Sequence, residues 1–504
     1  MSTASFWRRS LARAVVMVLQ SAASRVLGIL SSGLLARMLT PLDWGALQAV
    51  TNVAGTLTQT LKLSVDGGLQ IRISETKRAA TEPSDGEFLA AGLVLLTIAV
   101  AAALLVGNVF GRSAASLFGD PSLAPWMGLG GAMAAGQLIG QIGVTLLSFG
   151  AFRTYGAINT WLAVAYVVVL GVGYVSGARQ LGFAVAALLC MQVGNGVLML
   201  VCSVRAWRAR GIRLRFERVG RTSWDLLKLG VPVYLAAAVP AVVWFLVSAR
   251  VARVTGLEAL ATVRIVATLN QIVSFVPAAL AQTFLTQFAG ARGAGNRVPT
   301  HDFVRYVRII VAGSLLSSLG TMLIAPWLVP ILFGPQYASA AKLVALGLMT
   351  ATVLATKQAV LVGLMSERRT SYALLDALVA SVAGALFALW WMPRLGIAGM
   401  MLAEFAAHAL SMLVLATLLT TRLSSAAGVG HARAQAGVAA LGLTLGLVSL
   451  ATTYQVFDTP ARLPWLLAQA LLALVGVPWC LFTRDERKAA REELQRALPS
   501  RRSV

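Results

Sequence analysis

Apolar runs of roughly 18 to 25 residues follow one another along most of the chain, with short polar breaks between them. Each run is long enough to cross about 30 Å of hydrocarbon as a helix, and none has the alternating pattern of a barrel strand. The pattern therefore predicts about fourteen helical spans. They are centred near residues 25, 55, 98, 136, 167, 192, 240, 273, 320, 352, 382, 408, 442 and 472.

The composition predicts the same class. Of the 504 residues, 58% are hydrophobic and only 12% are charged, which is too little polar surface to cover a soluble globule. We expect an all-α polytopic membrane protein with no soluble domain. The first apolar run contains Arg25 and is not followed by a small-residue cleavage site, so it predicts a retained helix and not a signal peptide.

The net charge of +23 would suggest a nucleic-acid partner in a soluble protein. In a membrane protein, the distribution of the charge along the chain indicates the orientation of the spans instead. Most of the 42 Lys and Arg residues fall in the tails and the even-numbered loops. By the positive-inside rule both termini are cytoplasmic, and no nucleic acid is expected as a partner. The densest basic stretch, from Arg205 to Lys228, predicts a linker on anionic membrane lipids, although it also suits the binding of a partner protein. Arg484 to Arg502 predicts a short amphipathic cytoplasmic helix.

Four short segments between the spans recur in the same order at an offset of about 215 residues. We call them the repeat anchors: 36–43 recurs as 252–258, 117–119 as 332–334, 153–154 as 369–370, and 181–184 as 395–398. Each pair follows the same number of spans, so the repeat unit is six helices, and an even number makes the two lobes parallel. We predict lobes at 1–215 and 216–423, with helices 13 and 14 and a basic tail at 424–504. Two such bundles enclose a cleft that rocking exposes to either face.

The sequence around the first anchor resembles a known family. Residues 24–28 and 34–45 resemble the opening of the polysaccharide-export flippases of the multidrug/oligosaccharidyl-lipid/polysaccharide (MOP) superfamily, and 325–338 and 392–400 resemble their later loops. The resemblance covers roughly residues 10 to 420. It implies two six-helix bundles with two extra helices in the bacterial inner membrane. Its implied activity is to flip a lipid-linked oligosaccharide for a surface polysaccharide such as O-antigen, lipopolysaccharide or exopolysaccharide. A polysaccharide polymerase or glycosyltransferases would then be partner proteins.

Such a substrate carries a diphosphate, which needs positive charge at membrane depth. Arg25 lies midway between the charges that bracket span one, and Arg264 lies in span eight, where the family resemblance implies a basic residue facing the cavity. A guanidinium matches phosphate oxygens bidentately, so these two are the leading substrate-binding candidates. In the competing interpretation, each arginine pairs with a buried acid or snorkels to the interface. Lys357 is a weaker candidate in span ten.

The remaining intramembrane charges have two interpretations each. Lys62 and Asp66 have the spacing of a helical ion pair, although Lys62 also suits substrate contact. Glu404 and His408 suit either proton coupling or an interhelical hydrogen bond. Asp376 is a further coupling candidate or a partner of a lone cation. The three cysteines have no metal or disulfide spacing, and no catalytic or cofactor motif occurs, so neither metal nor cofactor is expected.

Several function classes remain open. A membrane glycosyltransferase or polymerase is disfavoured because such proteins generally have one large outward loop, and every outward loop here is short. A multidrug exporter of the same superfamily is disfavoured because the deep charges of the first lobe are Arg25, Lys62 and Asp66, which suit an anion. A lipid II flippase and a scaffold without transport are both compatible with the same pattern. The leading prediction is a secondary transporter and not an enzyme.

Overall fold

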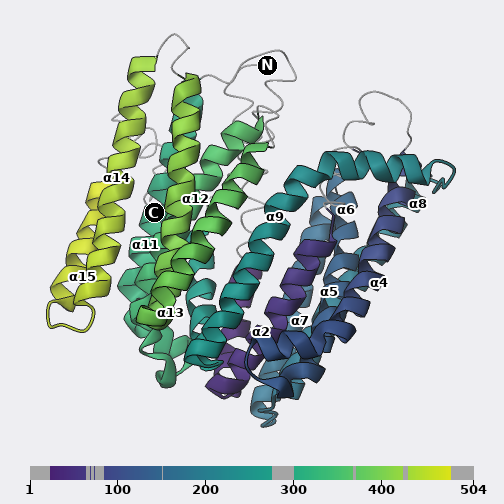
Figure 1. Cartoon of the computed structure of the whole chain (residues 1–504), viewed down its shortest axis with the longest axis horizontal. Coiled ribbons are helices and arrows are strands. Elements are labelled where there is room, and N and C mark those ends of the chain that lie inside the picture. Colours follow the sequence, from purple (N-terminus) through teal and green to yellow (C-terminus); the bar gives the residue numbers. More distant parts are fainter. Residues whose placement is uncertain are drawn as a thin grey trace, which may run out of the picture. The chain divides into compact units, whose positions relative to one another are not determined.

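The computed structural model describes residues 23–63, 69, 73, 85–149, 151–274, 300–366, 371–423 and 429–477. The described chain is helical throughout and forms two compact units (Figure 1). Unit 1 comprises residues 1–268, 329–337 and 369–411, and unit 2 comprises 269–328, 338–368 and 412–504. Besides the N-terminal helices, unit 1 therefore includes the end of one later helix and most of another, and the predicted six-helix lobes remain a prediction.

The described part of unit 1 begins with a helix over 23–38, and the elements that follow lie in unit 1 except for residues 269–274 at the end of the last one. They are α2 (Pro41–Leu61), α4 (Asp85–Leu117), η1 (Pro121–Leu123), α5 (Ala124–Gly140), η2 (Gln141–Gly143), α6 (Val144–Ser148), α7 (Phe152–Val175), α8 (Leu181–Ala209), α9 (Val219–Thr255) and a helix from residue 258 to the end of the described segment at 274.

The remaining elements are α11 (Thr300–Phe333), η3 (Pro335–Tyr337), α12 (Ala340–Ser366), α13 (Ser371–Leu423), α14 (Val429–Val456), α15 (Arg462–Leu471) and a π-helical turn, η4 (Leu472–Gly476). Of these, η3 lies in unit 1, α11 and α13 have residues in both units, and the others lie in unit 2. Within unit 2, α12 packs against α14, and the hydroxyls of Ser318 and Thr352 join α11 to α12 at 2.6 Å. Trp465 Nε1 on α15 donates to Thr453 Oγ1 on α14 at 3.0 Å.

The predicted spans agree with the helices. All fourteen predicted centres lie in helix, the last of them in η4. Among the described residues, nine helices are long and apolar enough to cross a membrane, and the segment Ser371–Leu418 holds two predicted spans. Gly396, with φ 56° and ψ −131°, breaks α13 at the predicted loop between them. The protein is an all-α polytopic membrane protein.

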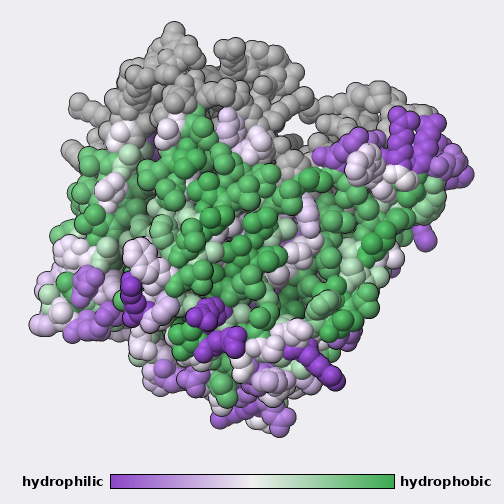
Figure 2. Space-filling model, viewed as in Figure 1, coloured by the Kyte–Doolittle hydropathy of each residue, from purple (hydrophilic) through white to green (hydrophobic). Residues whose placement is uncertain are grey.

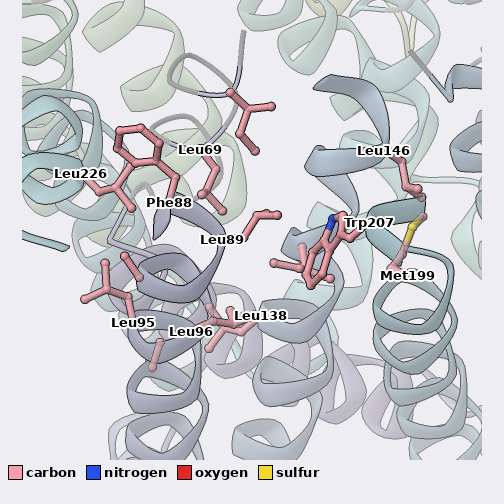
Figure 3. Packing of buried hydrophobic residues seen from close by; sticks show 14 of the residues in the cluster. Leu69, Phe88, Leu89, Leu95, Leu96, Leu138, Leu146, Met199, Trp207 and Leu226 are labelled. Carbon is pink, nitrogen blue, oxygen red and sulfur yellow. The ribbon is translucent and has the colours of Figure 1, made fainter. Parts of the chain in front are cut away.

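Helix α5 is the centre of packing in unit 1, where it contacts α2, α4 and α8. Glycines allow this close approach: a Cβ on Gly131 would lie 2.7 Å from the carbonyl oxygen of Ala103 on α4. A Cβ on Gly136 would lie 2.8 Å from the backbone of Gln192 on α8. Small residues are the usual means of close helix packing in membranes. Figure 3 shows the apolar side chains that fill the space between these helices, including Leu96 and Leu138.

The basic linker forms the turn between α8 and α9. Helix α9 first runs across the end of unit 1 and then bends into the bundle, so only Tyr234–Thr255 is apolar enough to span (Figure 1). Figure 2 shows hydrophilic side chains gathered over this turn, beside a hydrophobic surface. The turn is anchored by the N–H of Arg215, which donates to the carbonyl of Gly86 at 3.3 Å. A cationic segment beside an apolar surface suits the predicted position at lipid headgroups.

The first two repeat anchors of each predicted lobe meet one another in unit 1, at what we call the anchor junction (36–45, 117–119, 245–257 and 331–337). Arg37 Nε donates to the carbonyl of Leu332 at 3.2 Å, and its Nη2 donates to the carbonyl of Ile331. Both carbonyls belong to the last turn of α11, which leaves them without helical partners. Trp44 stacks on Phe333 with 6.0 Å between the ring centroids.

The reverse contact is also present at the anchor junction. Phe118 meets Phe245 edge to face at 5.5 Å, and a Cβ on Gly119 would lie 3.4 Å from Cγ of Arg253. In the repeat, Arg253 corresponds to Arg37, and Gly119 corresponds to Gly334. The first anchor of each predicted lobe therefore packs on the second anchor of the other. The junction closes one end of unit 1 around buried aromatic side chains.

Candidate functional site

Arg264 is a charged residue on the helix over 258–274, which corresponds to predicted span eight. The helix over 258–274 begins after Gly256, whose φ of 90° is a left-handed conformation that glycine adopts readily. Two turns later Arg264 lies close enough to the phenol of Tyr166 on α7 to interact with it electrostatically. Tyr166 is only 8% exposed, and its hydroxyl has no hydrogen-bond partner in the described chain.

Arg264 and Tyr166 together bring several hydrogen-bond donors to one place in the predicted span. The Arg264 side chain is partly exposed. A guanidinium has five N–H donors, and a phenol adds one more. Sequence reasoning found Arg264 and missed Tyr166, since a tyrosine in an apolar run looks like ordinary packing.

Arg25 lies in the helix over 23–38, also in unit 1, and is partly exposed. It interacts with another group of the chain. One turn further on, a Cβ on Gly28 would meet no atom within 4 Å, so the helix faces open space there. Ser31 and Ser32 both turn back to the carbonyl of Gly28 at 2.9 Å, which satisfies their hydroxyls within the helix.

Lys62 lies at the end of α2. The helix ends at Leu61, Lys62 is its C-cap, and Leu63 has a φ of 50°. Asp66 lies outside the described residues, so its ion pair with Lys62 remains a prediction.

The fourth cation, Lys357, belongs to unit 2. It lies on α12, is only 3% exposed and interacts with another group of the chain. A buried amine with a partner is part of the packed interior of that unit. Its role in substrate binding remains a prediction, as do those of Arg25, Arg264 and Lys62.

The acidic candidates lie on the two arms of α13. Asp376 on the first arm accepts a hydrogen bond from the hydroxyl of Ser411 on the second, which joins the arms side by side. Glu404 is partly exposed, and no hydrogen bond or ion pair reaches its carboxylate from the described residues. His408 interacts with another group of the chain. Glu404 and His408 thus share a helical face, and proton or ion coupling through them remains a prediction.

The described residues hold no group of three or more His, Cys, Asp or Glu side chains that could bind a metal. They do enclose a polar cavity of about 430 Å³ within unit 1, which we call the amide pocket. It is lined by Thr58, Gln59, Gln137, Gly140, Gln141, Val144, Tyr155, Asn159, Gln192, Asn195 and Met199. None of these side chains is charged, and sequence reasoning directed at charges missed them. The signal was present as amides four residues apart, at 137 and 141, inside an apolar run.

A second, open groove of about 760 Å³ lies over α7 and α8. Its lining is mostly apolar and includes Trp161, which is 71% exposed, and Arg153 from the third repeat anchor stands at its end. An exposed tryptophan on a spanning helix suits contact with lipid chains.

The sequence matches no protein family description and no curated protein. Solved structures do share the fold. The lipid II flippase MurJ, in an inward closed conformation, is 12% identical with a TM-score of 0.61, and the match covers 95% of this chain and all of that one. The Vibrio cholerae MATE transporter VcmN is 13% identical with a TM-score of 0.63, covering 84% and 98%.

A third similar structure is a MOP-superfamily transporter from Pyrococcus furiosus, reported for the reverse polarity of its binding pocket. It is 12% identical with a TM-score of 0.56, and the match covers 82% of this chain and 96% of that one. Identities this low establish the fold and leave the activity open. The chain has the fold of the MOP-superfamily transporters.

Proposed function

We propose that the protein is a flippase that moves a polyisoprenyl-diphosphate-linked oligosaccharide across the bacterial inner membrane for surface polysaccharide synthesis. The observation that carries the proposal is Arg264 in predicted span eight, which interacts electrostatically with the buried phenol of Tyr166. A fixed charge at this depth costs roughly 2.5 to 3.5 kcal/mol on insertion scales, which favours a functional role. A diphosphate is the group that guanidinium and phenol donors suit best.

Alternating access would use the anchor junction as one of two gates. With the junction closed, a substrate reaches Arg264 from the opposite end, and opening the junction releases it. Arg25 and Lys62 in unit 1, and Lys357 in unit 2, are proposed as further contacts for the anion. Glu404, His408, Asp376 and Asp66 are the proposed coupling groups. Polymerase or glycosyltransferase partners would act on the released or incoming glycan.

The substrate test is flipping by the full-length protein in proteoliposomes, with a fluorescent polyisoprenyl diphosphate disaccharide as substrate. Arg264→Gln should reduce the flipping rate about tenfold or more. Arg264→Lys should recover part of that rate, because the lysine ammonium keeps the positive charge but cannot bind a phosphate bidentately as the guanidinium does. Arg112→Gln on the exposed surface of α4 is the matched control and should behave as wild type. Unchanged flipping in Arg264→Gln would refute the proposal.

Two other functions are distinguished by the same preparation. A lipid II flippase is the second candidate function, because the structure of a lipid II flippase matches 95% of this chain. Transport of lipid II by the wild type at the same rate as the disaccharide substrate would favour this function. A multidrug exporter would instead move a cationic dye such as ethidium. Arg264→Gln should leave that transport unchanged or faster, because the positive charge opposes a cation.

The orientation is proposed from charge placement. Reporter fusions at Gly290 and after Val504, both outside the described residues, should each report cytoplasm. A signal from the far side at either position would contradict the assignment of both termini to the cytoplasm. The same fusions test the parallel lobes at 1–215 and 216–423, since an inverted second lobe would place Gly290 outside.

A further inference from the structure

The amide pocket is lined by six elements of unit 1, and its lining is uncharged and mostly polar. Its lining includes six amide side chains, two from α8 and one each from α2, α5, α7 and η2: Gln192, Asn195, Gln59, Gln137, Asn159 and Gln141. Each primary amide carries two N–H donors and a carbonyl acceptor. So many amides on facing helices inside a membrane domain need partners, because unpaired polar groups are costly there.

Only part of this capacity is used by the protein itself. Thr58 Oγ1 donates to Gln137 Oε1 at 2.8 Å, and Asn159 Nδ2 donates to the carbonyl of Tyr155 at 3.1 Å. The side chains of Gln59, Gln141 and Gln192 make no hydrogen bond to the described residues. The Oδ1 atom of Asn195 is buried without a partner there. The pocket thus presents both donors and acceptors to whatever fills it.

The position of the pocket suits a substrate that enters opposite the anchor junction. Thr40 at the junction begins α2, and Thr58 and Gln59 lie near its other end. Eighteen residues of helix at 1.5 Å each separate the two by roughly 27 Å. When the junction is closed, the amide pocket therefore lies on the far side from it.

The chemistry selects among possible occupants. A cation would lack a neutralising carboxylate, and an anion would lack a positive charge, since no charged residue lines the cavity. Water fills polar cavities by default, but the volume of about 430 Å³ lies within the range of small-molecule sites. A sugar ring offers hydroxyls that both donate and accept, without net charge, which matches the amides.

We propose that the amide pocket binds the sugar of the lipid-linked substrate, at a site separate from the cationic residues that hold the diphosphate. This inference rests on the proposed function for the identity of the carrier but not for the chemistry of the pocket. It assigns glycan recognition to neutral residues of α2, α5, η2, α7 and α8. Gln59, Gln141 and Gln192 are the available donors, since none of them hydrogen-bonds to a described residue, and the first experiment replaces Gln141 and Gln192.

The first experiment uses free sugars and the full-length protein in detergent. Methyl glycosides of glucose, galactose and N-acetylglucosamine are tested by saturation-transfer NMR. At least one should bind the wild type, and the double variant Gln141→Met, Gln192→Met should weaken it by roughly four- to a hundredfold, as expected for two lost hydrogen bonds at about two- to tenfold each. Methionine keeps the length of glutamine and removes the amide.

The matched control is Gln48→Met, an amide on α2 that bonds to Asn52 Oδ1 at 2.9 Å and does not line the pocket. It should bind sugar as the wild type does. Absence of binding by all three glycosides, or equal binding by wild type and the double variant, would overturn the inference and leave a water-filled cavity. Equal weakening by Gln48→Met would also overturn it, as a merely structural effect.

A second experiment separates this inference from the proposed function. Polyisoprenyl diphosphate is compared with and without an attached sugar. The double variant should remove the tighter binding of the glycosylated lipid and leave the bare lipid unchanged, whereas Arg264→Gln should weaken both. If sugars bind in the amide pocket but neither lipid binds the protein, the proposed function fails and the pocket assignment stands.

Discussion

Arg37 and Leu332 are 295 residues apart in the chain, yet the guanidinium of the first caps the carbonyl of the second at 3.2 Å. The neighbouring carbonyl of Ile331 accepts from the same side chain. A planar fork with several donors can satisfy two carbonyls of one helix end at once, which an ammonium cannot do in the same way. Arg37 therefore supplies hydrogen bonds that hold the anchor junction together.

Replacing Arg37 should open that junction. Arg37 is exposed, so its hydrogen bonds contribute at the lower end, about 1.5 kcal/mol, and Arg37→Gln should raise the population of open molecules by up to about tenfold. The measurement is the rate at which maleimide labels an Ala36→Cys variant that lacks the three native cysteines, because Ala36 is fully buried at the junction. Arg112→Gln is the control. An unchanged labelling rate would show that the hydrogen bonds of Arg37 do not hold the junction closed.

Gly45 tests the closest backbone contact at the junction. A Cβ there would lie 2.0 Å from the carbonyl oxygen of Leu257, so Gly45→Ala must displace backbone and should destabilise the protein by on the order of 2 kcal/mol. Gly55 on the same helix has no atom within 4 Å of its Cβ position. Gly55→Ala should therefore leave the apparent melting temperature unchanged or slightly higher. Equal effects of the two substitutions would contradict the close approach.

Because the phenol of Tyr337 is buried, the protein should lose stability at alkaline pH. Burial raises the pKa of its phenol above the ordinary value of 10.0, and the negative charge of Glu258 raises it further. Above pH 10 the unfolded chain therefore loses this proton while the folded chain keeps it, so stability falls as pH rises, by up to about 1.4 kcal/mol per unit. Below pH 10 the contribution is flat.

The measurement is the apparent melting temperature at pH 9 and pH 11. Tyr337→Phe should reduce the difference between the two values, because the buried hydroxyl has no hydrogen-bond partner in the described chain. Tyr174→Phe, at the half-exposed end of α7, is the matched control. A pH difference that Tyr337→Phe leaves untouched would rule out this phenol as its source.

Tyr166→Phe separates function from stability. The Tyr166 hydroxyl is buried without a hydrogen-bond partner in the described residues, so removing it should keep or raise the melting temperature. Flipping of the diphosphate substrate should nevertheless fall by roughly two- to tenfold, because one donor beside Arg264 is lost. A parallel loss of stability and flipping would instead assign Tyr166 to packing.

The sequence predicted the fold well because span length and hydropathy are local properties. Even the break at Gly396 fell in a predicted loop. Helix α2 shows where hydropathy is a weaker guide. It is not among the nine helices that are apolar enough to span, and its Thr58 and Gln59 line a polar cavity.

The candidate site was less accessible to sequence reasoning. Charge at membrane depth directs attention to Arg25 and Arg264, but the end of α2 depends on the left-handed Leu63, which composition does not reveal. Neutral amides carry no such signal singly. Their significance depends on lining one cavity from helices that are distant in sequence, as Gln59 of α2 and Gln192 of α8 do in the amide pocket.

The reciprocal contacts of the anchor junction have an evolutionary consequence. Arg37 packs on the second anchor of the other half, and its counterpart Arg253 packs on the second anchor of the first. Two identical subunits related by a twofold axis would meet in this way, through an isologous interface. The junction thus has the reciprocal contacts of a homodimer interface within one chain, so a substitution at one anchor must fit the anchor that it contacts in the other predicted lobe.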